Sequence, residues 1–587
     1  MRSKGFLSRW YLVLFLALGS VAPGCEDENA PKTWVGKLGE DRKRPGAMRH
    51  LRQLWETRVT AAHDNLQDPQ VQGFLNEALP AIVDAFRAHP SELSTRKEAI
   101  TILAGCHDPR AVPALLSALE FSPGNTDSER IALQAAQALE VLHPNSPDAV
   151  QKLLAGIDRA VGSQGSAPQL REAILLALGA AGDRSVVPRL RDILKRPLDQ
   201  QDFRTARGAC QALSRLGDPS AADALVYALY LRVRTNGVFP YAARALVHLG
   251  ASVAVPAIIN TMEGHNGEVM LLLQSYGSTP GAEVPPPGTL QGVALDALRG
   301  FADRRAIQPL ITLAQNRTVL ADAPSSRLLR ARAAEALAYS ALPLPPNDPD
   351  RARAYDVIAA LFNEEPVAQS DMAGLTADSL AMLGDPRAAG LIAARLNDRQ
   401  LQNPGAEPIA YRIGLMSPLA RAVRHGDIAT YDRVSTTTRS LLERLSHDPE
   451  AQDEDSQTQI RQIRTGLQAV DAVAAVARDC NDGDLACYRG KLASTDRDVL
   501  RKVFRMMSWT LVDNADARTL LLSRGNATDP PIRQAIHLAV DAMSPHGCAD
   551  CITRLEAIIE GEHNQESKSL LHLDAEFLIA RLRARAQ

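Results

Sequence analysis

The sequence predicts an all-α protein, an α-solenoid in which antiparallel helix pairs stack into a superhelix. A phrase rich in Ala and Leu returns along the chain at helical spacing, and each copy is interrupted by a Gly-Asp-Pro type of break. Aromatic residues make up only 4% of the sequence, which favours closely packed helices over sheets that depend on aromatic and β-branched side chains. The 587 residues exceed one compact core, whereas repeats that pack only on their neighbours have no such limit.

The first 24 residues have the composition of an export signal. Three basic residues, Arg2, Lys4 and Arg9, precede an apolar run from Trp10 to Gly19. The run is shorter than the roughly 20 apolar residues that a membrane-spanning helix needs, and small residues follow it. We therefore expect residues 1–24 to be a signal peptide that is removed from the mature chain.

The end of this signal, SVAPGC, resembles the end of a bacterial lipoprotein signal. The resemblance implies that Cys25 receives a lipid and becomes the first mature residue, tethered to a membrane without a spanning helix. The expected location is the bacterial cell envelope, lipid-anchored and either facing the periplasm or exposed at the surface. Residues 25–60 are mostly polar, with a charged stretch at 39–46, and are expected to form a mobile tether.

The Ala/Leu phrase defines the repeat. Six copies begin at Glu98, Glu172, Ala206, Tyr241, Gly292 and Met372. Each contains a helix with apolar residues at i, i+3 and i+4, a break, and a second apolar-faced helix. In the break, Gly ends the first helix in a left-handed conformation, Asp caps the next helix, and Pro suits its first position. The Asp residues of the breaks are Asp108, Asp183, Asp218, Asp303 and Asp385.

The spacing of these breaks identifies the kind of repeat. Asp183, Asp218 and the equivalent Ala251 follow one another at about 34 residues, and longer gaps fit two units or a unit with an insert. The pattern resembles the HEAT family over most of residues 91–397 and more loosely over 530–585. That resemblance implies a solenoid that binds proteins along an extended surface. The signatures of tetratricopeptide and ankyrin repeats are missing from the sequence.

The expected domains follow from this reading. The solenoid spans residues 61–446, an acidic linker covers 447–459, and a C-terminal helical repeat module covers 460–587. The last helix has an apolar face and a basic end, as expected of a terminal cap. Two Gly/Pro-rich inserts, at 264–288 and 342–350, either carry partner specificity or are tolerated surface insertions.

Seven cysteines occur in the sequence. Cys106 and Cys210 stand at apolar helical positions and are expected to be buried, inert thiols. Four others form two close pairs in the C-terminal module, Cys480 with Cys487 and Cys548 with Cys551. In an exported protein, paired cysteines favour disulfides, and both spacings permit local pairing. Pairing across the two would require distant repeats to meet, which a solenoid does not naturally arrange.

Two other interpretations of the second pair stay open. His546, Cys548, Cys551 and His563 are residue types that form a zinc site. A C-x-x-C motif at the start of a helix also suits a redox centre, because the helix N-terminus stabilises a thiolate. A single C-x-x-C is weak evidence for either role. The alternative function is therefore a metal- or thiol-dependent envelope protein that uses this His/Cys cluster.

Composition and missing motifs exclude several function classes. The 65 basic and 68 acidic residues leave a net charge of −3, so no basic excess exists for binding nucleic acid. The sequence contains no Gly-x-Ser-x-Gly, Gly-rich phosphate loop or His-Glu-x-x-His motif. We therefore expect no catalytic residues, no cofactor and no small-molecule substrate. The predicted function is a non-catalytic, membrane-tethered scaffold that binds one or more proteins.

Overall fold

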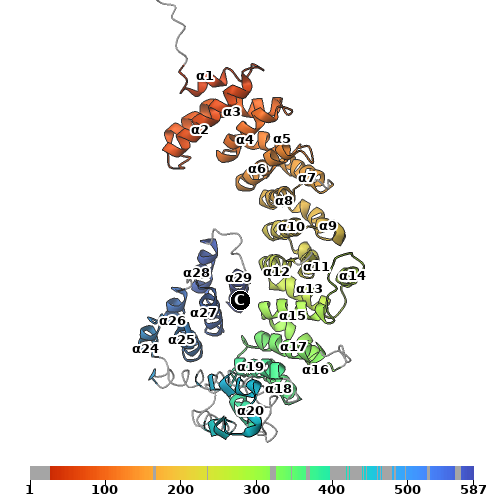
Figure 1. The fold of residues 1–587 in the computed structure, drawn as a ribbon, viewed down its shortest axis with the longest axis vertical. Coiled ribbons are helices and arrows are strands. Elements are labelled where there is room, and N and C mark those ends of the chain that lie inside the picture. Colours follow the sequence, from red (N-terminus) through yellow and green to blue (C-terminus); the bar gives the residue numbers. More distant parts are fainter. Residues whose placement is uncertain are drawn as a thin grey trace, which may run out of the picture. The chain divides into compact units, whose positions relative to one another are not determined.

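The computed structural model is built almost entirely of helices (Figure 1). It describes residues 27–162, 167–233, 236–317, 325–345, 347–364, 370–396, 484–495, 497–524, 529–561 and 570–586, together with short stretches between 415 and 480. The chain divides into two compact units, Met1–Val186 and Val187–Gln587. The strands in the described residues are β1 (Arg232–Val233) and β2 (Asn236–Gly237), a short antiparallel pair. The predicted fold class, an all-α solenoid of stacked antiparallel helix pairs, is confirmed.

The first unit contains two rows of helices. Its helices are α1 (Pro31–Val35), α2 (Arg44–Ala61), α3 (Pro69–Ala88), α4 (Leu93–Gly105), α5 (Val112–Ala118), α6 (Thr126–Leu142), α7 (Pro147–Gly162) and α8 (Pro168–Ala181). Helices α2, α4, α6 and α8 pack side by side in one row, and α3, α5 and α7 in the other. Each helix therefore contacts its own pair and the next pair, as a repeat array requires.

The tether predicted for residues 25–60 is wrong from Pro31 onward. Helices α1 and α2 lie in this segment, and Met48, Leu51 and Trp55 of α2 are buried. The ring of Trp55 packs against that of Phe74 in α3, with centroids 5.8 Å apart. Met48, Leu51 and Trp55 recur at about one-turn spacing among charged residues, and such a stripe is enough to pack an amphipathic helix against its neighbours.

The second unit contains repeat helices of its own and ends in a further group of helices. Its repeat helices are α9 (Val187–Leu194), α10 (Phe203–Leu216), α11 (Ala222–Leu229), α12 (Phe239–Leu249), α13 (Ala251–Met262), α14 (Gly267–Ser275), α15 (Thr289–Phe301), α16 (Ile307–Gln315), α17 (Ser325–Ala341), α18 (Pro349–Glu364), α19 (Ser370–Leu383) and α20 (Arg387–Leu396). The C-terminal helices are α24 (Leu485–Lys491), α25 (Arg497–Thr510), α26 (Ala515–Leu522), α27 (Pro530–Ala542), α28 (Ala549–Glu560) and α29 (Leu570–Ala586).

The breaks between paired helices have the predicted chemistry. Gly182 and Gly217 end their helices with φ of 74° and 59°, in the left-handed region that glycine enters without a steric penalty. The side chain of Asp218 accepts a hydrogen bond from the backbone N–H of Ser220, 2.8 Å away. The other Asp residues of the breaks make the same contact two residues ahead: Asp108, Asp183, Asp303 and Asp385. Because the glycine and the capping Asp lie within a few residues of each other, the sequence alone predicts where one helix ends and the next begins.

The two inserts differ from plain loops. The first, at residues 264–288, contains helix α14, and Tyr276 at its end accepts a hydrogen bond from the backbone N–H of Arg232, 2.6 Å away. The second, at 342–350, contributes Leu342–Pro345 to a cavity described below. The predicted linker at 447–459 lies within the second unit. Among the described helices none is both long and apolar enough to cross a bilayer.

The C-terminal helices form a group with its own apolar core, here called the C-terminal module (residues 484–586). Apolar side chains of α25, α26, α27 and α29 meet in this core. Helix α29 also packs on α12 and α15 of the repeat array, and it lies beside them in Figure 1. The sequence predicts one apolar face on this terminal helix, whereas α29 is buried both against its own module and against the repeat array.

Candidate interaction site

The first cysteine pair lies at the start of helix α24. The Cα atoms of Cys480 and Cys487 are 5.6 Å apart, and their sulfurs are at bonding distance. Cys480 is fully buried in the core of the C-terminal module. Asp484 caps α24 by accepting a hydrogen bond from the backbone N–H of Cys487 (3.0 Å). The pair ties the chain entering the module to the first helix of the module.

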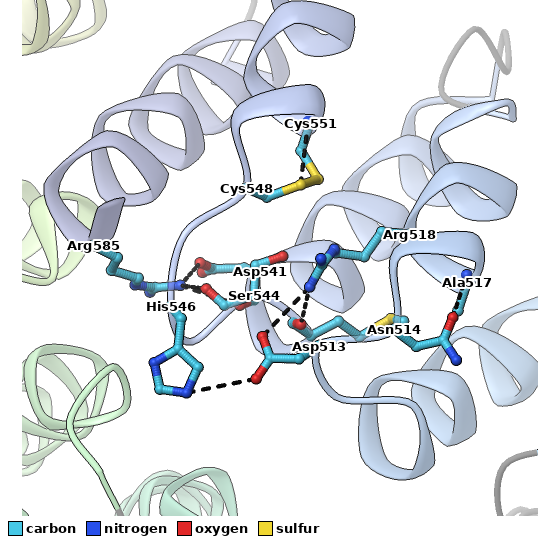
Figure 2. Close-up of polar contacts among 11 residues, drawn as sticks. Asp513, Asn514, Ala517, Arg518, Asp541, Ser544, His546, Cys548, Cys551 and Arg585 are labelled. Atoms are coloured by element: carbon cyan, nitrogen blue, oxygen red, sulfur yellow. Dashed lines mark hydrogen bonds and ion pairs between the residues drawn. A yellow bond between two sulfur atoms is a disulfide. The ribbon is translucent and has the colours of Figure 1, made fainter. Parts of the chain in front are cut away.

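The second pair lies at the start of helix α28. The Cα atoms of Cys548 and Cys551 are 5.2 Å apart with their sulfurs at bonding distance, and Cys551 is buried in the same apolar core. The imidazole of His546 is 74% exposed and lies 3.6 Å from a carboxylate oxygen of Asp513 (Figure 2). No group of three His, Cys, Asp or Glu side chains positioned for a metal occurs in the described residues. His563, the fourth member of the possible zinc set, lies outside them, as does Cys25.

A buried charge network lies next to this disulfide, between α27 and α29. The carboxylate of Asp541, only 4% exposed, is 2.8 Å from Arg581 and 3.0 Å from Arg585. Arg585 also donates to the backbone carbonyl of Ser544 (3.1 Å), as Figure 2 shows. Two guanidinium groups thus share one carboxylate away from water, which holds the end of α29 firmly on α27.

The electrostatics of this network follow from its geometry. Burial by itself would raise the pKa of Asp541, but Arg581 and Arg585 outweigh burial and hold that pKa below its usual value. Burial lowers the pKa of Arg585, although Asp541 opposes the shift. The network therefore depends on an ionised carboxylate, and protonating Asp541 would leave two buried cations facing each other.

Helix α29 is docked on the repeat array by Arg581 and Phe577. Nη2 of Arg581 contacts Asp541, and Nη1 donates a 2.6 Å hydrogen bond to the carbonyl oxygen of Gly300 at the end of α15. The ring of Phe577 meets the ring of Phe301 edge to face, with centroids 5.2 Å apart. Because Gly300 has no side chain, the ring of Phe577 rests directly on the backbone of α15.

An ion pair completes the docking on α12. Arg244 pairs with Glu576 of α29, and the two side chains are only 11% and 9% exposed. An ion pair shielded from water is specific, because removing either partner leaves the other charge buried and uncompensated. Arg244, Gly300 and Phe301 form a surface that we call the α12–α15 face.

A cavity of about 1010 Å³ lies beside this docking contact, between α17–α20 of the array and the C-terminal module. Its walls are largely apolar, and two of the lining side chains, Val512 and Leu538, are 46% and 48% exposed. Arg351 supports the opposite wall by donating to the backbone carbonyls of Leu344 and Leu383. A concave, mostly apolar site with a few fixed charges is typical of ligand or peptide binding.

Sequence reasoning singled out none of the docking residues. Arg244, Gly300 and Phe301 belong to two copies of the Ala/Leu phrase and look like ordinary repeat positions. One signal was available in the last helix, where Leu573, Phe577, Leu578, Ile579 and Leu582 cover more than one face. A helix that is apolar on several faces is expected to be buried on several sides.

Comparison with family models supports the repeat assignment. A model of HEAT repeats matches residues 159–232, and a model described as a PBS lyase HEAT-like repeat matches residues 95–121. The predicted HEAT resemblance is confirmed for these two stretches. No curated protein matches the chain.

Solved structures with similar arrangements are distant in sequence. Yeast importin-β is 13% identical at a TM-score of 0.30, with 94% of this chain and 74% of the importin covered. An importin-β crystallised in ammonium sulfate is 11% identical at a TM-score of 0.35, covering 94% and 83%. The CpcE–CpcF complex of phycocyanin lyase from Nostoc is 23% identical at 0.23, covering 46% and 93%. Similarities this distant assign neither a partner nor an activity to this chain.

Proposed function

We propose that this chain is a non-catalytic scaffold that binds protein segments on its repeat array and is tethered to a membrane of the bacterial cell envelope. One observation carries the scaffold role: the repeat array already holds a helix, α29, on the α12–α15 face by ring packing, a hydrogen bond and an ion pair. Helix repeats of this kind present extended surfaces suited to such contacts.

Site-directed photo-crosslinking in cells tests the scaffold role. A photoreactive residue at Leu344 or Leu538, both on the cavity wall, is expected to capture the same protein repeatedly. The matched control is the same residue at Leu271, which is 66% exposed on helix α14 away from the cavity walls. Identical crosslinking patterns at all three positions, or none at the cavity, would count against a scaffold that binds there.

The lipid anchor at Cys25 is the second part of the proposal. Its support is the sequence SVAPGC at the end of an apolar export signal. Cys25→Ala is expected to accumulate unprocessed precursor, whereas the mature wild-type chain should remain with membranes after a high-salt wash. A Cys25→Ala chain that is processed and fractionates as the wild type does would contradict the anchor.

The alternative, a metal- or thiol-dependent protein using His546, Cys548 and Cys551, has a separate test. Protein purified from the envelope without chelator is expected to contain no stoichiometric zinc and no reactive thiol at Cys548 or Cys551. The geometry supports this expectation, because the two sulfurs are at bonding distance from each other and the ring of His546 lies near Asp513. One zinc ion per chain would favour the alternative.

A further inference from the structure

The α12–α15 face has a definite chemical shape. Because Gly300 has no side chain, an aromatic ring can approach the backbone of α15 there, and Phe301 presents a second ring beside it. The carbonyl of Gly300 in α15 accepts a hydrogen bond, and Arg244 in α12 supplies a positive charge. These features suit a helix that carries an acid, an aromatic residue and a long donor on one side.

Helix α29 meets each feature with Glu576, Phe577 and Arg581, and Arg581 also pairs with Asp541 of its own module. Phe577 and Arg581 are one turn apart and share a face of the helix, and Glu576 lies beside that face, next to Phe577 in the sequence. The core of the C-terminal module instead contains Leu578, Ile579 and Leu582. Neither Glu576 nor Phe577 belongs to that core. Leu578, Ile579 and Leu582 therefore build the module, Glu576 and Phe577 contact the repeat array, and Arg581 contacts both.

We propose that the α12–α15 face is the surface by which this scaffold recognises its partner, and that α29 competes with the partner for it. The partner presents an amphipathic helix with a Glu-aromatic pair followed one turn later by Arg. The inference rests on the proposed scaffold function and names the partner's chemistry. When the partner helix binds, the C-terminal module separates from the α12–α15 face as a unit, because α29 stays packed in the core of its own module.

The contact is suited to competition. It includes a ring pair, an ion pair and a backbone hydrogen bond, and a partner helix with the same side chains can form the same three interactions. A surface that is open in only one chain in a hundred lowers the apparent affinity of its partner about 100-fold. Releasing α29 also separates the walls of the neighbouring cavity, which exposes Val512 and Leu538 further.

A peptide-binding experiment tests this with the full mature chain. The probe is a fluorescent peptide of residues 570–586 in which Leu578→Glu and Leu582→Lys replace the module-facing side chains. It is titrated against the wild type, against Glu576→Ala/Phe577→Ala, and against that double variant with Gly300→Leu added. We expect the double variant to bind the peptide at least about tenfold more tightly than the wild type, and the triple variant not to bind it.

The controls separate competition from misfolding. A second peptide that lacks the Glu and Phe side chains is expected not to bind the double variant. Circular dichroism of all three chains should coincide, because the substituted residues lie outside the module core and a Leu is compatible with helix α15. Hydrogen exchange of α12 and α15 should become faster in both variants, which reports the opening directly.

Several outcomes would overturn the inference. Equal binding to the wild type and the double variant would show that α29 does not compete, and binding to the triple variant would place the peptide elsewhere. Absence of binding to the open double variant would show that the face does not recognise such a helix. A wild-type chain that is dimeric by light scattering, and monomeric after Phe577→Ala, would show that a second copy fills the face. None of these readouts uses a cellular partner, so they are independent of the crosslinking test.

Discussion

Gly300 and Phe577 are in contact across the docking surface: a Cβ added at residue 300 would lie 2.6 Å from the nearest ring atom of Phe577. The two residues belong to helices α15 and α29, and the hydrogen bond from Arg581 to the carbonyl of Gly300 spans 281 positions of the chain. The absence of one methyl group at Gly300 is therefore what permits the C-terminal module to close on the repeat array. The predictions below test this closure and the charges and thiols around it.

Gly300→Ala is expected to weaken the closure. The new methyl group forces the ring of Phe577 or the backbone of α15 to move, and overpacking of this kind costs about 1–3 kcal/mol. Hydrogen exchange of amides in α12 and α15 should accelerate by roughly 5- to 150-fold, since 1.4 kcal/mol is a factor of ten.

Gly390→Ala is the matched control for Gly300→Ala. Gly390 also lies inside a repeat helix, α20, but a Cβ added there meets no atom within 4 Å. The substitution should leave the closure unchanged and stabilise its own helix by up to about 1 kcal/mol. Similar acceleration in both variants would show that Gly300 has no special role.

Arg244 and Glu576 should behave as a coupled pair. Arg244→Ala or Glu576→Ala leaves one charge largely buried, so each is expected to weaken the closure by up to about 3 kcal/mol. The double variant removes both charges and should cost clearly less than the sum of the two single changes. Hydrogen exchange of α12 in the wild type, the two single variants and the double variant gives a double-mutant cycle. Strictly additive effects would show that the two side chains do not interact.

Acid should weaken the C-terminal module through Asp541. The pKa of Asp541 is held below its usual value in the folded chain, so its contribution is complete above roughly pH 3.9, the ordinary pKa of Asp. That contribution is lost as the pH falls through the lower folded pKa. Asp541→Asn should lower the urea midpoint of the module at pH 7 and remove this part of its acid sensitivity.

Asp574→Asn, on the neighbouring helix α29, provides the opposite comparison. Burial raises the pKa of Asp574, which means that its charged form is disfavoured in the fold. The neutral amide avoids that cost, so the variant should not lower the urea midpoint at pH 7. A loss equal to that of Asp541→Asn would indicate that any change to a carboxyl of α27 or α29 is damaging, regardless of its charge.

The free thiols should be inert in the native chain. Burial raises the pKa of Cys106 to about 11 and raises that of Cys210 further, so neither forms the reactive thiolate at pH 8. Iodoacetamide should modify neither residue until the chain is unfolded. After unfolding without a reductant only these two should react, and a reductant should add the four cysteines of the C-terminal pairs. Reaction of all four paired cysteines without a reductant, in addition to Cys106 and Cys210, would contradict both disulfides.

Part of the structure is encoded locally and was predicted from the sequence. The break at Asp218 needs only Gly217 to end one helix and the Asp side chain to cap the next, so a short stretch of sequence specifies it. The helix pairs, their stacking and the buried state of Cys106 and Cys210 follow from such short-range chemistry. Local reasoning failed at residues 31–60, where charged neighbours obscured the stripe that contains Met48 and Leu51.

The sequence by itself determined that this protein is a stack of helix pairs, because each pair needs only its own residues and an adjoining pair. Only the tertiary structure decided that α29 returns to α12 and α15. The return depends on contacts between residues hundreds of positions apart. The ring of Phe577 packs on Gly300, Glu576 pairs with Arg244, and Arg581 donates to the carbonyl of Gly300. Such complementarity is a property of two distant surfaces together, and neither surface shows it alone.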